Sequence, residues 1–153
     1  MSRLVTYFVR FVAMLAGFGA ACLAASLFVN LLLASTVVAV IPEFSEAARP
    51  ALFAVVPFFA LVLANFAFVP FLIVAMAAEF LGWRSWLAHA LGGGVVALYV
   101  GWQMTQVFER PDAASDPGLM LFTLAAGLFG GIAYWAVAGR NAGNWRDVPS
   151  AAS

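Results

Sequence analysis

The chain has 153 residues, of which 65% are hydrophobic and 9% are charged, and its formal net charge is zero. Soluble domains carry about 25% charged residues, so this composition excludes an ordinary soluble protein and indicates an integral membrane protein. The charges form no basic surface that could hold nucleic acid, because seven arginines are balanced by seven acidic residues. We expect one membrane domain over residues 1–153.

The first apolar run, Leu4–Ile41, is interrupted only by Arg10. As one helix it would be about 57 Å long, well beyond the ~30 Å of membrane hydrocarbon. Arg3, Thr6 and Arg10 share one helical face, as in amphipathic segments that lie in the membrane interface. The pattern therefore predicts an interfacial segment at residues 2–10 and a membrane helix at residues 11–40.

A cleaved signal peptide is the alternative interpretation of this first segment. Arginines, an apolar stretch and the small residues at positions 19–21 fit the start of that pattern. The apolar run nevertheless continues far past any plausible cleavage point. We therefore expect an uncleaved membrane anchor.

Two uncharged runs follow, Ala51–Ala78 and Trp86–Phe108. Each exceeds the ~20 residues that a helix needs to cross a membrane. The short connection Gly82–Ser85 leaves no room for a soluble domain between them. The sequence thus predicts an antiparallel transmembrane hairpin with helices at residues 51–79 and 86–108, with a kink near Pro70 because proline removes a backbone hydrogen bond.

The polar segment Glu109–Gly118 reads as a loop, and Asp116 followed by Pro117 is typical of a helix start. A fourth helix is expected at residues 117–138, ended by Gly139, with Arg140 beside its last carbonyls. Residues 141–153 are expected to form a flexible tail. The predicted fold is an all-α integral membrane four-helix bundle with an N-terminal interfacial segment.

Four spans place both termini on one side of the membrane. Cytoplasmic loops are enriched in arginine and lysine, so the side with more arginines is expected to be the cytoplasm. That side would hold Arg3, Arg10, Arg84, Arg140 and Arg146, against Arg49 and Arg110 on the other. We expect a multi-pass protein of the bacterial inner membrane with cytoplasmic termini.

Small residues repeat at helical spacing in three of the predicted helices. They include Gly17 in the first, Gly93 and Gly101 in the third, and Gly127 and Gly131 in the fourth. Small residues let membrane helices approach closely. These positions are expected to be packing sites within the chain, and an interface between copies is the alternative.

Four uncharged polar side chains lie in the outer parts of the predicted helices: Asn30, Asn65, Gln103 and Thr123. Asn65 and Gln103 are each nineteen residues from Arg84, so an antiparallel hairpin would place them at one depth. We expect a polar layer with one side chain per helix. Hydrogen bonding between helices is the favoured interpretation, and a site for a small polar ligand or a lipid headgroup is the alternative.

Glu79, Arg84 and His89 form a second candidate cluster, at the predicted inner interface. A carboxylate, a guanidinium and an imidazole could relay protons or bind a headgroup phosphate. We favour the simpler interpretation that water and lipid headgroups satisfy all three. No ionisable residue lies deep in the four predicted membrane cores, which argues against an ion pump.

The chain holds one cysteine, Cys22, and one histidine, His89. An intrachain disulfide and a zinc site with the usual nitrogen and sulfur ligands are therefore excluded within one copy. We expect no catalytic residues, no metal and no cofactor.

The expected function is that of a non-enzymatic structural or accessory subunit of a membrane assembly. The alternative is a homo-oligomeric carrier or channel for a small polar or lipid-like solute. The expected partners are the lipid bilayer and a membrane protein or a second copy of the chain.

Overall fold

The computed structural model describes residues 3–40 and 45–143. Within them the fold is all-α, with α1 at Arg3–Val40, α2 at Ser45–Leu81, α3 at Trp86–Val107 and α4 at Pro117–Val137. Two short 3-10 helices, η2 at Pro111–Ser115 and η3 at Gly139–Asn141, flank α4. The predicted tail lies outside the described residues from position 144 onward.

The last two helices agree closely with the sequence prediction. Asp116 caps α4, since its side chain accepts a hydrogen bond of 2.9 Å from the backbone N–H of Gly118. Arg140 donates to the carbonyl of Ala136, in the last turn of α4. Gly82 has a φ of 67°, a backbone conformation that glycine adopts readily, and so allows the tight connection between α2 and α3.

The first two helices begin earlier than predicted. The described part of the segment predicted at residues 2–10 is continuous with the helix predicted at residues 11–40, because α1 runs without interruption from Arg3. Its position in the membrane interface stays a prediction. No proline occurs in α1, so nothing in its sequence breaks the backbone hydrogen bonding. The helix α2 begins at Ser45 rather than at residue 51, and Pro50, close to its start, does not end it.

Three stretches of the described helices are long and apolar enough to cross a membrane, Tyr7–Thr36, Ala54–Leu81 and Pro117–Val137. They indicate a membrane protein with transmembrane helices. The helix α3 was predicted as a span and is not among the three. It is uncharged, but His89, the glycines at positions 92–94, Gln103 and Gln106 reduce its apolar character.

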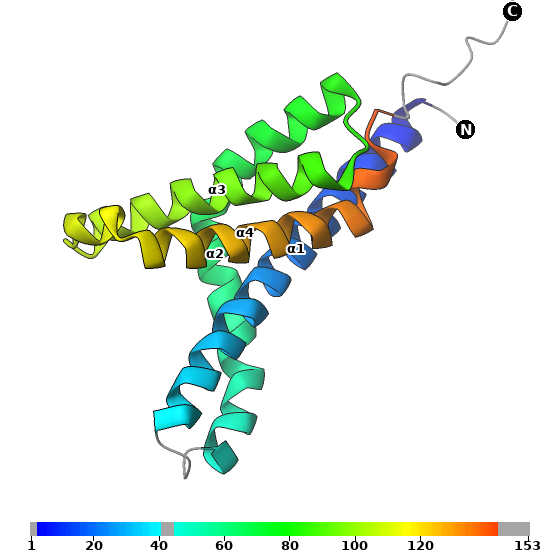
Figure 1. Ribbon diagram of the computed structural model, residues 1–153. Helices are drawn as coiled ribbons and strands as arrows, with labels where there is room; N and C mark the ends of the chain where they lie inside the picture. Colours follow the sequence, from blue (N-terminus) through cyan, green and yellow to red (C-terminus); the bar gives the residue numbers. More distant parts are fainter. Residues whose placement is uncertain (1–2, 41–44, 144–153) are drawn as a thin grey trace, which may run out of the picture.

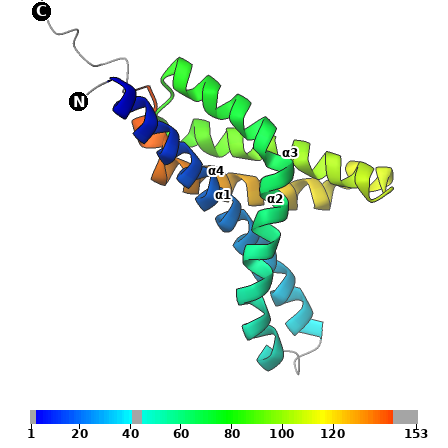
Figure 2. The same cartoon turned by 180° about the vertical axis from the view of Figure 1, so that it is seen from behind.

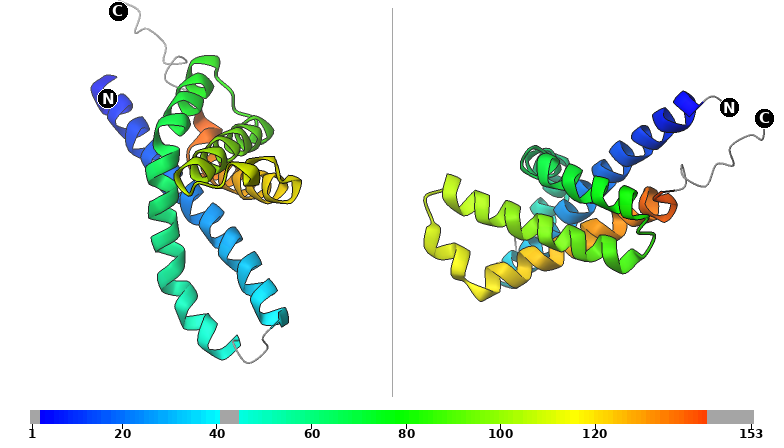
Figure 3. Two further views of the ribbon diagram at one scale, coloured as in Figure 1. Left: turned by 90° about the vertical axis from the view of Figure 1, so that its left-hand side faces the viewer. Right: turned by 90° about the horizontal axis from the view of Figure 1, so that it is seen from above.

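The four helices form two hairpins that diverge from each other (Figures 1 and 2). The start of α1 and the end of α4 lie together at one end of the molecule. From there α1 and α2 extend in one direction and α3 and α4 in another, so the end of α1 and the turn η2 between α3 and α4 lie far apart (Figure 3). The helix α2 bends part-way along (Figure 1), as expected for a helix that contains Pro70.

The tightest helix contact, between α3 and α4, is built on glycine. A Cβ added at Gly93 would meet the carbonyl oxygen of Gly127, and one added at Gly131 would meet the carbonyl oxygen of His89. A Cβ on Gly127 would lie 2.5 Å from the Cβ of Ala97. Only glycine fits where these backbones touch.

The other two small-residue positions also lie at contacts within the chain. A Cβ on Gly17 in α1 would lie 2.8 Å from the ring of Tyr134 in α4, and one on Gly101 in α3 would lie 3.0 Å from the Thr123 methyl group. All five glycines therefore serve packing between helices of a single chain.

Candidate functional site

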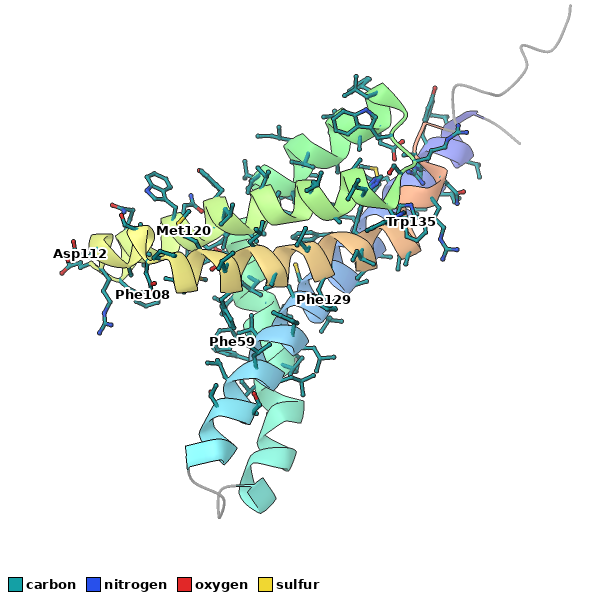
Figure 4. The ribbon with its side chains drawn as sticks, viewed as in Figure 1. Phe59, Phe108, Asp112, Met120, Phe129 and Trp135 are labelled. Carbon is teal, nitrogen blue, oxygen red and sulfur yellow. The ribbon has the colours of Figure 1, made fainter. Side chains whose placement is uncertain are left out.

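An apolar cavity of about 290 Å³ lies where the four helices meet. The aromatic rings of Phe18, Phe59 and Phe71 line it from α1 and α2. The opposite side consists largely of small residues of α3 and α4, including Ala97 and Ala126. Phe59 lies in the angle between the two hairpins (Figure 4). Small side chains on α3 and α4 leave this space unfilled, although Phe122 and Tyr134 of α4 also line it.

Few polar groups face this cavity. Thr123 lines it, but its hydroxyl donates to the carbonyl of Leu119 at 2.7 Å in the same helix. His89 and Tyr134 contribute at the end nearest the chain termini, where their rings lie 5.5 Å apart. A cavity with such a lining excludes water and accepts an apolar occupant.

A second hollow, an open groove of about 630 Å³, lies between α2 and α3. Asn65 from α2 and Gln103 and Tyr99 from α3 supply its polar groups. The Gln103 Nε2 group donates to the Tyr99 hydroxyl at 3.3 Å. The Gln103 Oε1 atom is buried, and no group in the described part of the chain donates a hydrogen bond to it.

Asn65 is exposed at the same groove. The residues that the structure describes form no hydrogen bond with its amide. An unpaired amide on an apolar helix is costly, because hydrocarbon offers it no hydrogen bond. The groove therefore presents two amides with unused hydrogen-bonding capacity.

The cavity and the groove are neighbours. Val74 of α2 and Val96 of α3 line both of them. Gly92 permits this close approach of α2 and α3, since a Cβ there would lie 2.8 Å from Val74. Only these two valine side chains are shared by the linings of the apolar cavity and the groove.

The predicted polar layer of four side chains is not formed. Asn65 and Gln103 share the groove, whereas Thr123 lines the cavity. Asn30 lines neither, and its amide donates to the carbonyl of Ser26 at 2.8 Å in its own helix. The layer is not formed because the two hairpins diverge. Residues at equal distances from the ends of their helices therefore do not lie at one level in all four helices.

The ion pair at the terminal end differs from the predicted cluster. Glu79 pairs with Arg10 of α1, through both the Nε and the terminal nitrogen of the guanidinium. Arg10 also donates to the carbonyl of Ala138 at 2.9 Å, and the backbone N–H of Gly143 donates to the other Glu79 oxygen at 3.0 Å. The pair joins α1, α2 and the segment after α4.

The other two members of the predicted cluster bind elsewhere. Arg84 donates to the carbonyl of Ala142 at 3.0 Å. His89 is buried, and its Nδ1 lies 2.9 Å from the carbonyl of Ser85, which can only accept, so Nδ1 carries the proton. Its Nε2 has no partner in the described part of the chain and lies against Gly139. The three side chains therefore do not form one proton relay.

Sequence reasoning missed Arg10 and Tyr99. Arg10 is the one charge in its apolar run, and Glu79 directly follows the uncharged run Ala51–Ala78. Isolated charges in membrane segments tend to pair with each other. That rule was available from the sequence alone. Tyr99 lies one helical turn before Gln103, so its hydroxyl was also within predictable reach.

Within the described residues, no three histidine, cysteine, aspartate or glutamate side chains gather as a metal site. Comparisons of the chain with protein families, with curated proteins and with solved structures found no match. The cavity, the groove and the ion pair are the features of the described residues that bear on function.

Proposed function

We propose that the chain is a non-enzymatic integral membrane protein that binds a lipid-like molecule in its central cavity. The observation that carries this proposal is the apolar cavity of about 290 Å³ bounded by all four helices. Its size is close to the lower end of ligand pockets, about 300–1,000 Å³. The proposal needs no second copy, because one chain supplies every wall.

The energetics of an empty cavity support an occupant. The cavity is half open, and while it is empty its apolar lining loses van der Waals contacts, which costs free energy. Water does not offset this cost in an apolar space. Hydrocarbon chains are abundant around a membrane protein, and one such chain would restore the missing contacts.

The proposed location is the bacterial inner membrane, with four spans and cytoplasmic termini. The excess of arginine at the terminal end supports this orientation. Crossing by α3 is part of the proposal, supported by its 22 uncharged residues and its long contact with the apolar helix α4. The cavity would then lie within the hydrocarbon, open to lipid.

Native mass spectrometry of protein extracted in mild detergent tests this function. We expect a lipid-like molecule to remain bound to the unaltered chain. Ala126→Leu adds bulk to the cavity lining and is expected to reduce the bound fraction at least fivefold. Ala136→Leu, at an exposed position of the same helix, is the matched control and should leave it unchanged.

Two results would contradict the proposed function. One is the absence of any lipid-like adduct on the unaltered chain after mild extraction. The other is an adduct of equal occupancy in Ala126→Leu and Ala136→Leu, which would place the lipid on the outer surface.

An accessory subunit is the second candidate function, and the divergence of the hairpins favours it. The open angle between them leaves a large apolar side chain partly uncovered, that of Phe59 of α2 (Figure 4), which is 37% exposed. A helix of a larger membrane protein could fill that angle. A protein partner of fixed stoichiometry in the same mass spectrum would support this role.

A further inference from the structure

The polar atoms of the groove between α2 and α3 define what kind of chemical group would satisfy them. The Gln103 Oε1 atom is unpaired and has almost no accessible surface, so it needs a donor, and a ligand reaches it only when the Gln103 side chain turns toward the groove. The Tyr99 hydroxyl accepts from Gln103, so its own proton is available for donation. The Asn65 amide can donate as well. The site thus offers two amide oxygens as acceptors, and the Tyr99 hydroxyl and the Asn65 amide nitrogen as donors.

The groove is also uncharged. Every residue that lines it is apolar or carries an amide or a hydroxyl. A phosphate or a carboxylate would find no cation there, and burying such a charge without a partner is expensive. A ketone or an ester accepts but does not donate, so it would leave Gln103 Oε1 unpaired. A hydroxyl group both donates and accepts, and it is neutral.

We propose that this groove binds the hydroxyl head of an uncharged lipid-like alcohol. The apolar chain of the same molecule passes Val74 and Val96 into the central cavity. This inference rests on the proposed function, since it assigns the head-binding part of the same ligand site. The groove and the cavity share those two valines, so the head and chain sites are neighbours with only these side chains between them.

A pair of matched probes tests the assignment, oleyl alcohol and its methyl ether. They share one chain, but the ether has lost the hydrogen that would reach Gln103. Leaving a buried acceptor unpaired costs about 1–3 kcal/mol, so we expect the purified chain in detergent to bind the alcohol about tenfold more tightly. Binding is measured by displacement of a fluorescent fatty-alcohol analogue.

Three variants test which residues cause the preference for the alcohol over the ether. Gln103→Leu keeps the side-chain volume and removes the acceptor, so the preference for the alcohol should fall below twofold. Asn65→Leu changes an exposed side chain without a partner among the described residues, so it should fold normally and weaken alcohol binding several-fold. Gln106→Leu, an exposed glutamine of the same helix outside the groove, should keep the full preference.

The outcomes separate this inference from the function beneath it. Equal binding of alcohol and ether by the unaltered chain would overturn the inference while leaving the chain-binding cavity intact, with water satisfying the amides. A preference for the alcohol that survives in both Gln103→Leu and Asn65→Leu would overturn it too, because another group would then form the hydrogen bond with the hydroxyl. Failure of both probes to bind would contradict the proposed function itself.

Discussion

Arg10 and Glu79 show how single charges are accommodated in apolar helices. Each lies in an otherwise uncharged stretch, and their side chains are only 15% and 11% exposed. They pair with each other, and Ala138 and Gly143 supply further hydrogen bonds. Removing one partner leaves the other buried without compensation, which costs more than removing both.

Glu79→Gln should lower the free energy of unfolding by about 2–4 kcal/mol, because it leaves the Arg10 guanidinium unpaired. The double variant Arg10→Met with Glu79→Leu should recover much of that loss. Thermal unfolding in detergent, followed by circular dichroism, measures both. Glu109→Gln, an exposed acid at the opposite end of α3, is the control with no expected change. Losses that simply add in the double variant would refute the coupling.

At the scale of elements, the contact of α3 with α4 depends on the absence of side chains. Gly131→Ala would push a methyl group into the carbonyl of His89, where a backbone must move. We expect a loss of about 2–4 kcal/mol of stability, typical of overpacking and backbone displacement. Gly19→Ala is the matched control.

The Gly19 control should act in the opposite direction. Nothing lies within 4 Å of a Cβ at Gly19, so alanine there should stabilise α1 by about 0.5–1 kcal/mol through helix propensity. Thermal unfolding of the two variants checks the pair. An equal effect of both substitutions would show that the glycines of α4 are not packing sites.

The sequence predicted the four helices themselves better than the residues at which α1 and α2 begin. Caps and turns marked α3 and α4 to within one residue, because Ser85, Asp116 and Gly139 lie where the backbone changes direction. At the start of α1, by contrast, no proline or glycine between Arg3 and Arg10 marks where the helix begins. The expected bounds of α1 came from hydropathy, whereas its observed bounds follow the backbone hydrogen bonds.

The candidate site was predictable only in part. Counting residues from Arg84 predicted one depth for Asn65 and Gln103, and both line one groove, because they belong to helices joined by the short connection Gly82–Ser85. The same count failed for Asn30 and Thr123. Their heights depend on the angle between the two hairpins, and that angle arises from packing of glycines and aromatic rings, which spacing along the chain does not encode.

At the scale of the whole molecule, the two hairpins diverge from the end where α1 begins and α4 ends (Figure 1), and the half-open cavity lies where all four helices meet. The account requires that both hairpins cross the membrane, since otherwise lipid would not reach the cavity and the groove together. The helix α3 is the critical element, because it is the only one of the four without a candidate span. Its two ends must lie on opposite sides of the bilayer.

Site-directed labelling of single cysteines measures this directly. In a Cys22→Ala background, Ser85→Cys and Ser115→Cys place exposed thiols before and after α3. We predict that a membrane-impermeant maleimide added to intact cells with a permeable outer membrane labels Ser115→Cys but not Ser85→Cys until the inner membrane is opened. Labelling of both positions in intact cells, or of neither, would contradict a membrane-spanning α3 and with it a lipid-binding cavity between four spans.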